Sequence, residues 1–280
     1  MDKPEMQQAI QQAAGALQRA DALLIAAGAG MGVDSGLPDF RGDAGFWKAY
    51  PPFAALGLSF IDLANPAWFQ QDPELAWGFY GHRLQLYRET TPHNGFQILH
   101  QWAEQRGLEA FVFTSNVDGQ FQRAGFNDDH IVECHGSIHY LQCTDPCCEA
   151  IWPAEEVDLD IDETTFRAMP PLPLCPHCGA LARPNILMFH DGQWLWNRTQ
   201  AQQERFREWI EKLSDKELVI IECGAGTAVP SVRNLSEKLA RYGATLIRIN
   251  PQEPQGPEGT IAIQLGALKA LLAIQDEVER

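Results

Sequence analysis

The feature that most constrains the fold is a run of small residues directly after an apolar stretch. Residues 22–27 (Ala-Leu-Leu-Ile-Ala-Ala) are typical of a buried strand, and Gly28, Ala29 and Gly30 follow them. Small residues at this point let backbone N–H groups approach a phosphate closely, because a Cβ would block the approach. A tight turn with no ligand explains the same pattern. The run by itself therefore favours an α/β fold and leaves ligand binding open.

The residues behind this turn favour a binding loop. Asp39, Phe40 and Arg41 come directly after Pro38. An acid, an aromatic ring and a guanidinium behind a proline-stiffened turn are typical of a loop that folds over a ligand. This tail shifts the interpretation of the glycine turn toward ligand binding.

Composition limits the partners. The chain has 280 residues and a net charge of −16, which argues against a nucleic-acid binder, because phosphates need Lys and Arg to neutralise them. An acidic surface suits a basic partner such as a lysine-rich peptide, although solubility alone explains the charge equally well. We expect no membrane span, because no stretch approaches the roughly 20 apolar residues that one needs.

The start of the chain and its cysteines indicate a reducing compartment. Met-Asp-Lys-Pro-Glu lacks the basic region and apolar core of a signal peptide. The seven cysteines are an odd number, and four of them can be grouped as two close pairs. This usage predicts a metal site rather than a disulfide framework, and a cytoplasmic location.

Helical and strand patterns alternate along most of the chain. An amphipathic helix is expected over about 5–20 and a last helix over 265–274. A helix stripe is formed by Val232, Leu235, Leu239 and Tyr242, with Gly243 as its stop. Strands are expected at 23–27, 111–114, 131–133, 218–223 and 245–250. The alternation predicts an α/β fold, with a parallel sheet covered by helices on both faces.

Two segments interrupt the alternation. Residues 44–94 are rich in aromatics and prolines, which predicts a helical insert. Residues 138–184 carry five cysteines, which predicts a small metal-stapled module. The remaining parts, 1–43, 95–137 and 185–280, are then expected to form the large sheet domain.

The cysteine spacing predicts a structural zinc site. Cys175 and Cys178 form a two-residue knuckle, in which two thiolates bind one ion. The first half offers three sulfurs for two positions; we favour Cys143 with Cys147, and Cys148 is the alternative to Cys147. Four thiolates close the coordination shell of Zn²⁺ and leave no place for water or substrate.

Six ordered motifs carry a family resemblance. They are the run 28–41, Thr-Ser-Asn-Val-Asp at 114–118, His-Gly-Ser at 135–137, the cysteine cluster, Arg-Pro-Asn-Ile at 183–186 and Ile-Asn at 249–250. Together they resemble the sirtuins, the NAD-dependent protein deacylases, with Gly32 standing where the family has serine. The resemblance implies a Rossmann-like NAD-binding domain, a zinc module and a helical module, with the active cleft between them.

The resemblance also implies the reaction and its residues. An acyl-lysine oxygen of a protein or peptide substrate attacks C1′ of the nicotinamide ribose and expels nicotinamide. A ribose hydroxyl then reacts, giving lysine and O-acyl-ADP-ribose. His135 is the expected base, since a neutral imidazole is available at cell pH. Asn116 is expected to hold the ribose or a water, and Asp118 the nicotinamide amide; turn capping explains both residues equally well.

The implied NAD contacts cover both ends of the cofactor. Gly28, Ala29 and Gly30 are expected at the pyrophosphate, Asp39, Phe40 and Arg41 at the nicotinamide side, and Asn250 at the adenine-side ribose. Three departures from the family pattern bear on this. Ser115 replaces a glutamine associated with the ribose. Gly224, Ala225 and Gly226 stand where the family has Gly-Thr-Ser, yet still allow close backbone approach. The third departure is Phe-His-Asp at 189–191, in place of Phe-Gly-Glu on the strand that pairs with substrate peptide.

One residue pair bears on the acyl group. Tyr80 and Arg83 are three residues apart, so they share a helix face. This resembles the Tyr-x-x-Arg pair of desuccinylase-type sirtuins, in which both groups hold an acyl carboxylate, and Ala64 matches a small residue that leaves room there. An ordinary helix with an inward aromatic and an arginine at its rim is the alternative.

Two other functions use the same features. An NAD glycohydrolase or mono-ADP-ribosyl transferase would use the same pocket, and nicotinamide release without acyl peptide would favour it. A non-catalytic NAD-binding protein is the third hypothesis, against which Asn116, Asp118 and His135 argue.

Overall fold

The large part of the molecule is built on one parallel sheet. The computed structural model describes residues 3–38, 50–51, 54, 57–105, 107–162 and 164–280. Six strands pair in the order β11-β10-β9-β1-β2-β3, all parallel to their neighbours. Their bounds are Ala22–Ala27 (β1), Glu109–Thr114 (β2), Ile131–Glu133 (β3), Leu218–Cys223 (β9), Thr245–Ile249 (β10) and Ile261–Ile263 (β11). The predicted α/β class is confirmed.

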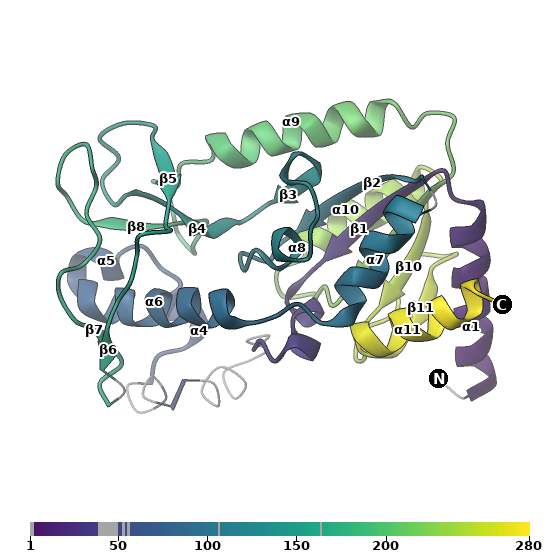
Figure 1. Ribbon diagram of the computed structural model, residues 1–280, viewed down its shortest axis with the longest axis horizontal. Helices are drawn as coiled ribbons and strands as arrows, with labels where there is room; N and C mark the ends of the chain where they lie inside the picture. The colour runs from purple at the N-terminus through teal and green to yellow at the C-terminus, as the bar shows by residue number, and fades with distance from the viewer. Residues whose placement is uncertain (1–2, 39–49, 52–53, 55–56, 106, 163) are drawn as a thin grey trace.

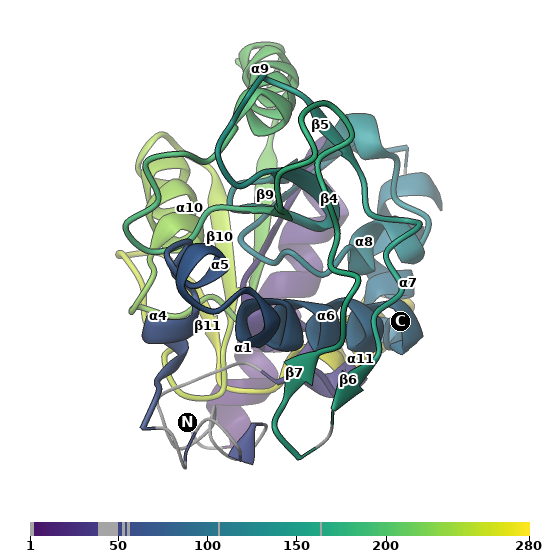
Figure 2. The same ribbon diagram turned by 90° about the vertical axis from the view of Figure 1, so that its left-hand side faces the viewer.

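Helices cover both faces of this sheet, as Figures 1 and 2 show. On β1, Leu23 and Ile25 belong to one apolar core and Leu24 to the other, because successive side chains of a strand point to opposite faces. The first core also contains α1 (Lys3–Arg19), α7 (Asn94–Gln105) and α11 (Ala267–Val278). The second contains α9 (Asn197–Glu211) and α10 (Ser231–Arg241).

A second part of the molecule lies beyond the carboxyl end of the sheet (Figure 1). It contains α4 (Phe60–Leu63), α5 (Trp68–Gln71) and α6 (Pro73–Glu89). It also contains an antiparallel sheet of β5 (Ile151–Pro153), β4 (Gly136–Cys143) and β8 (Ala182–Ile186), and a hairpin of β6 (Ile161–Asp162) and β7 (Arg167–Ala168). These elements share one core, since Trp77 and Tyr80 of α6 cluster with Ile138 of β4 and Ala182 of β8.

Short elements connect these parts. The turns η1 (Ala29–Met31) and η2 (Val33–Ser35) follow β1, whereas α8 (Gln120–Arg123) and η3 (Asp128–His130) lie between β2 and β3. In the sheet, β2 lies on one side of β1 and β9 lies on the other. The chain continues from β1 to β2 and reaches β9 only much later, so the strand order reverses between β1 and β9. Ligands of open α/β sheets bind at such a point, outside the carboxyl ends of the strands.

Some local predictions need correction. Tyr242 was expected on the inward stripe of the helix over 232–242, but it is 81% exposed, because α10 ends one residue earlier. Gly243 has a φ of +105°, which confirms it as the stop. Strand β11 was not predicted; it follows a loop rich in proline and glycine, and no helix separates it from β10. No helix of the described residues is both long enough and apolar enough to cross a bilayer.

Candidate active site

Two glycine turns meet at the switch point. Gly28 and Gly30 follow β1, and Gly224 follows β9 with a φ of +63°. The Gly30 amide donates to the Gly224 carbonyl at 3.0 Å. A Cβ on Gly28 would lie 2.7 Å from Ala225 Cα, and one on Gly224 would lie 2.3 Å from Gly30 C. Glycine is required because the two backbones touch, whereas a Cβ on Gly226 would meet nothing within 4 Å.

Asn116 and Asp118 lie just beyond the end of β2. Asn116 Nδ2 donates to the Gly28 carbonyl at 3.1 Å, which ties this loop to the first glycine turn. Asp118 Oδ1 accepts from the Gln120 amide at 3.0 Å, so the turn-capping contact is present. Burial raises the pKa of Asp118 to about 6, because the charged carboxylate loses its hydration. Such a shift in a polar loop at the sheet edge is typical of functional sites.

His135 lies at the end of β3, where β4 begins. Its Nε2 is 3.1 Å from Ser231 Oγ, the first residue of α10. Burial lowers the pKa of His135 below its ordinary value, and a hydrogen bond to the Ser115 backbone opposes this shift. The ring is therefore neutral near pH 7 and can accept a proton from a hydroxyl. Ser115 contributes here through its backbone.

Gly136 lets the backbone adopt a left-handed conformation directly after His135. Its φ is +78°, and a Cβ there would lie 2.1 Å from the Asn185 carbonyl oxygen of β8. The pair His-Gly is thus explained physically, because only glycine allows β4 to pair with β8 directly behind the imidazole.

The four favoured cysteines are brought together. The sulfurs of Cys143, Cys147, Cys175 and Cys178 all lie within 4.8 Å of one another. Sγ of Cys143 is 3.7 Å from that of Cys178, and Sγ of Cys147 is 3.8 Å from that of Cys175. A tetrahedron with Zn–S bonds of about 2.3 Å has edges of about 3.8 Å, so the set fits Zn²⁺. Cys148 does not belong to this set.

The expected acyl-pocket residues are also close together. Arg83 is buried on α6 and donates to the Tyr87 hydroxyl from Nε at 3.1 Å and from Nη2 at 2.8 Å. The rings of Phe60, Phe79, Tyr80 and Tyr87 surround its guanidinium at 5.2–5.8 Å. Within the described part of the chain, the buried Tyr80 hydroxyl has no hydrogen-bond partner. Ala64 lies nearby, since its carbonyl accepts from the amide of Phe189, whose ring contacts Phe60.

The charge of Arg83 acts to lower the pKa of Asp118, against the larger effect of burial.

The strand expected at 189–191 is not found: β8 ends at Ile186, and these residues lie in the turn that follows it. The Asp191 side chain is fully buried and forms a bidentate ion pair with Arg183 of β8, at 2.7 and 2.9 Å. Asp191, which departs from the family pattern, therefore anchors this loop to β8. Its carboxylate is turned away from solvent.

Buried polar and charged side chains hold the loops that follow β9 and β10. Asn250 Nδ2 donates to the Ala225 carbonyl at 3.0 Å, and Asn250 Oδ1 accepts from two amides of the following loop. Arg248 of β10 pairs with Glu222 of β9 at 2.6 Å, and both are buried. Arg233 of α10 donates to the Ala225 carbonyl at 3.0 Å. These contacts clamp the second glycine turn.

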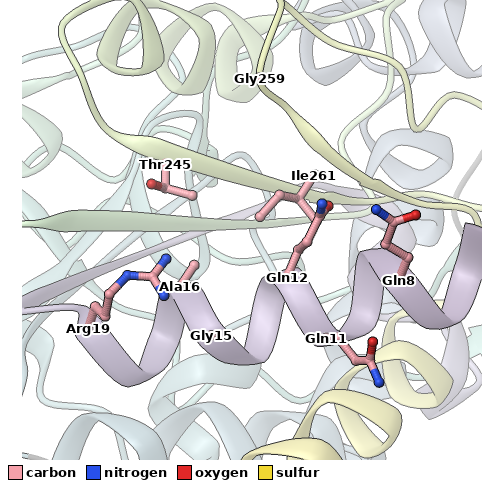
Figure 3. Close-up of a pocket in the computed structure, with 9 residues that line it drawn as sticks. All are labelled: Gln8, Gln11, Gln12, Gly15, Ala16, Arg19, Thr245, Gly259 and Ile261. Carbon is pink, nitrogen blue, oxygen red and sulfur yellow. The ribbon is translucent and has the colours of Figure 1, made fainter.

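A separate cavity of about 550 Å³ lies away from this site. Figure 3 shows it between α1 and the starts of β10 and β11. It is lined by Gln8, Gln11, Gln12, Gly15, Ala16, Arg19, Thr245, Gly259 and Ile261. Thr245 and Ile261 are the first residues of their strands, so this cavity lies at the opposite sheet edge from the glycine turns.

The expected loop residues Asp39, Phe40 and Arg41 lie outside the described residues. Sequence reasoning missed Ser231 beside the imidazole, the Arg183–Asp191 pair and the Glu222–Arg248 pair. Ser231 is 96 residues from His135, and a serine after a proline carries no signal of such a contact. Charged residues inside apolar strand runs were a usable signal for the second pair, because a buried charge needs a partner.

Glycine turns at the switch point of a parallel sheet, beside a neutral imidazole, are typical of enzymes that use a dinucleotide. The four thiolates fit a structural zinc site. The model of the Sir2 family matches residues 28–230. The chain belongs to the Sir2 family.

Individual relatives agree with this assignment. The chain is 30% identical to an NAD-dependent protein deacylase of Thermus thermophilus, over 91% of this chain and 89% of the relative. It is 32% identical to an NAD-dependent protein deacylase of Aeropyrum pernix, over 85% and 84%. Among solved structures, an ADP-ribose complex of a mutant Sir2 homologue has a TM-score of 0.72 at 26% identity, covering 100% of this chain and 97% of that one. An NAD complex of a Sir2 homologue has a TM-score of 0.71 at 25% identity, covering 96% and 93%.

Proposed function

We propose that this protein is an NAD-dependent protein-lysine deacylase that converts acyl-lysine, NAD and one water to lysine, nicotinamide and O-acyl-ADP-ribose. The observation that carries the proposal is the placement of His135. A half-buried neutral imidazole presents Nε2 to a hydroxyl at 3.1 Å, beside the glycine turns and the loop of Asn116 and Asp118. The relatives' names and the ADP-ribose and NAD complexes of the solved neighbours support it.

The glycine turns, the loop after β2 and His135 have separate roles toward NAD. NAD supplies an electrophilic ribose carbon and a leaving nicotinamide. The turns at Gly28–Gly30 and Gly224–Gly226 provide backbone N–H groups for the pyrophosphate. Asn116 orients the ribose side, and Asp118 holds the nicotinamide amide. His135 Nε2 then takes the proton of a ribose hydroxyl, in place of the Ser231 hydroxyl that it now meets.

The remaining assignments follow the same division. We propose Asp39, Phe40 and Arg41 at the nicotinamide side, Ser115 and Ala29 at the phosphates and ribose, and Asn250 at the adenosine side. The domain division at 1–43, 44–94, 95–137, 138–184 and 185–280 is part of this proposal. Zn²⁺ on the four cysteines stabilises the module without joining the reaction. A thiolate cluster needs reduced cysteines, which supports a cytoplasmic location.

An acidic acyl group is the favoured substrate. Arg83 is a buried guanidinium surrounded by aromatic rings. The buried Tyr80 hydroxyl has no hydrogen-bond partner among the described residues. A carboxylate at the end of a succinyl or glutaryl chain would accept from both groups, and the Arg fork suits two carboxylate oxygens. We expect Arg83→Met to lower activity on succinyl-lysine peptide at least about 100-fold more than on acetyl-lysine peptide, since a charge-assisted bidentate contact is lost. Equal losses on both peptides would remove the carboxylate assignment.

The central test is His135→Ala. The variant should lose deacylation of acetyl- and succinyl-lysine peptides, measured by mass spectrometry, while it still binds ADP-ribose in a calorimeter. His130→Ala is the matched control, because His130 is an exposed histidine at the end of η3. Normal turnover by His135→Ala would refute the base assignment. Nicotinamide release by the wild type without peptide, and no faster with it, would favour a glycohydrolase.

A further inference from the structure

Strand β4 lies along the loop that carries Asp118. The Ile138 amide of this strand donates to the Val117 carbonyl at 3.0 Å. The next residue, His139, places Nε2 at 2.9 Å from the Asp118 carbonyl oxygen. A carbonyl only accepts hydrogen bonds, so Nε2 carries the proton and donates it. Two successive residues of β4 therefore hold two successive residues of the loop.

The His139 ring also contacts the backbone directly after Asp118. Gly119 has a φ of +69°, and a Cβ on it would lie 2.7 Å from His139 Cδ2. The chain thus turns against the edge of the imidazole before α8 begins at Gln120. Glycine is needed at this turn because a side chain would occupy the space of the ring.

The side chain of Asp118 is held separately, through α8. Its Oδ1 accepts from the Gln120 amide at 3.0 Å. Gln120 Nε2 in turn donates to the carbonyls of Tyr87 at 3.3 Å and Thr90 at 3.4 Å, at the end of α6. The position of the carboxyl group therefore depends on two anchors, which are α8 for its side chain and His139 for its backbone.

Packing encloses the imidazole only in part. The ring borders a cavity of about 370 Å³, which is lined by Arg88, His139, Tyr140, Pro153 and Glu155. Because this space lies beside the ring, the hydrogen bond to Asp118 is needed to fix the orientation of the ring and the place of the loop.

We propose that His139 is a positioning residue for Asp118. Its hydrogen bond to the Asp118 carbonyl sets the place from which the carboxyl group meets the nicotinamide amide. A hydrogen bond to that amide is lost when the carboxyl group moves by about 1 Å, so a small shift of the loop is enough. The inference rests on the proposed role of Asp118 toward nicotinamide and does not depend on the acyl substrate.

The test compares binding of NAD with binding of ADP-ribose, which lacks nicotinamide, by calorimetry on the purified full chain without peptide. His139→Phe keeps a ring of similar shape and removes the donor. It should weaken NAD binding about tenfold and leave ADP-ribose binding unchanged, because only NAD offers an amide to Asp118. His139→Gln should restore most of the NAD affinity, since Nε2 of glutamine lies about as far along the side chain as Nε2 of histidine.

Two further variants calibrate this result. His100→Phe is the matched control, because His100 Nε2 lies 3.1 Å from the Gly125 carbonyl and the variant removes the same kind of bond elsewhere. Both of its affinities should equal those of the wild type. Asp118→Ala is the reference, and it should weaken NAD at least as much as His139→Phe does while sparing ADP-ribose.

The outcomes separate this inference from the proposed function. Equal weakening of NAD and ADP-ribose in His139→Phe, or no weakening of either, would overturn the role of His139, as would a loss that glutamine does not restore. If Asp118→Ala binds NAD as tightly as the wild type, the proposed role of Asp118 is wrong, and this inference with it. If circular dichroism shows His139→Phe to be unfolded, His139→Asn takes its place, because its shorter amide does not reach the Asp118 carbonyl.

Discussion

Asp118 is a buried acid whose ionisation opposes folding, and its replacement should stabilise the protein in a pH-dependent way. Folding raises its pKa from 3.8 to about 6, mainly through burial. Above the unfolded pKa the unfolded chain releases the proton more readily than the folded one. The resulting loss of stability begins as the pH rises past the unfolded value and is complete above the folded one.

The magnitude follows from the two pKa values. Ionisation of Asp118 costs about 0.5 kcal/mol near pH 4, about 1.6 kcal/mol near pH 5 and about 3 kcal/mol near pH 8. Asp118→Asn removes this cost of ionisation and keeps an oxygen that accepts from the Gln120 amide. It also buries an NH₂ group, at a cost of about 1 kcal/mol. The variant should therefore be about 2 kcal/mol more stable than the wild type near pH 8 and no more stable near pH 4.

Urea denaturation followed by circular dichroism from pH 4 to 8 measures this difference. Asp215→Asn is the control, because Asp215 is exposed in the loop before β9, and its difference from the wild type should be flat across the series. A pH-independent difference for Asp118→Asn would refute the reasoning. A gain in stability with loss of deacylation would show that the acid is kept for function.

Two further predictions concern the second part of the molecule. Cys175→Ser should abolish bound zinc in a metal analysis and lower the melting temperature, whereas Cys148→Ser should retain the metal; zinc lost in Cys148→Ser and retained in Cys147→Ser would reverse the ligand assignment. Gly136→Ala should lose at least about 2 kcal/mol more stability than Gly259→Ala, because both have positive φ but only the first would bring a Cβ against backbone. Similar losses for both variants would show that the backbone angle alone matters.

Much of the sheet was predictable because its strands are mainly apolar runs. The runs at 131–133 and 218–223 match β3 and β9, since strands buried on both faces need no polar alternation. The cysteine set was predictable because zinc knuckles have a fixed local spacing. Strand β11 was missed because it follows β10 through a proline- and glycine-rich loop, without the helix that separates the other parallel strands.

Contacts between distant residues were not predictable. Arg248 and Glu222 pair because the parallel register of β10 on β9 sets them directly opposite, and register is a property of the sheet. Ser231 meets His135 because β9 and β3 lie on opposite sides of β1 while α10 returns across the sheet face. No spacing in the chain encodes either contact.

The sequence by itself determined the chemistry of this protein, because glycine turns, a His-Gly pair and paired cysteines impose their requirements over a few neighbouring residues. Only the tertiary structure decided which hydroxyl faces the imidazole and which arginine pairs with each buried carboxylate. Those choices depend on how strands and helices far apart in the chain are placed against each other, since a buried charge or a reacting group is defined by its neighbours in space.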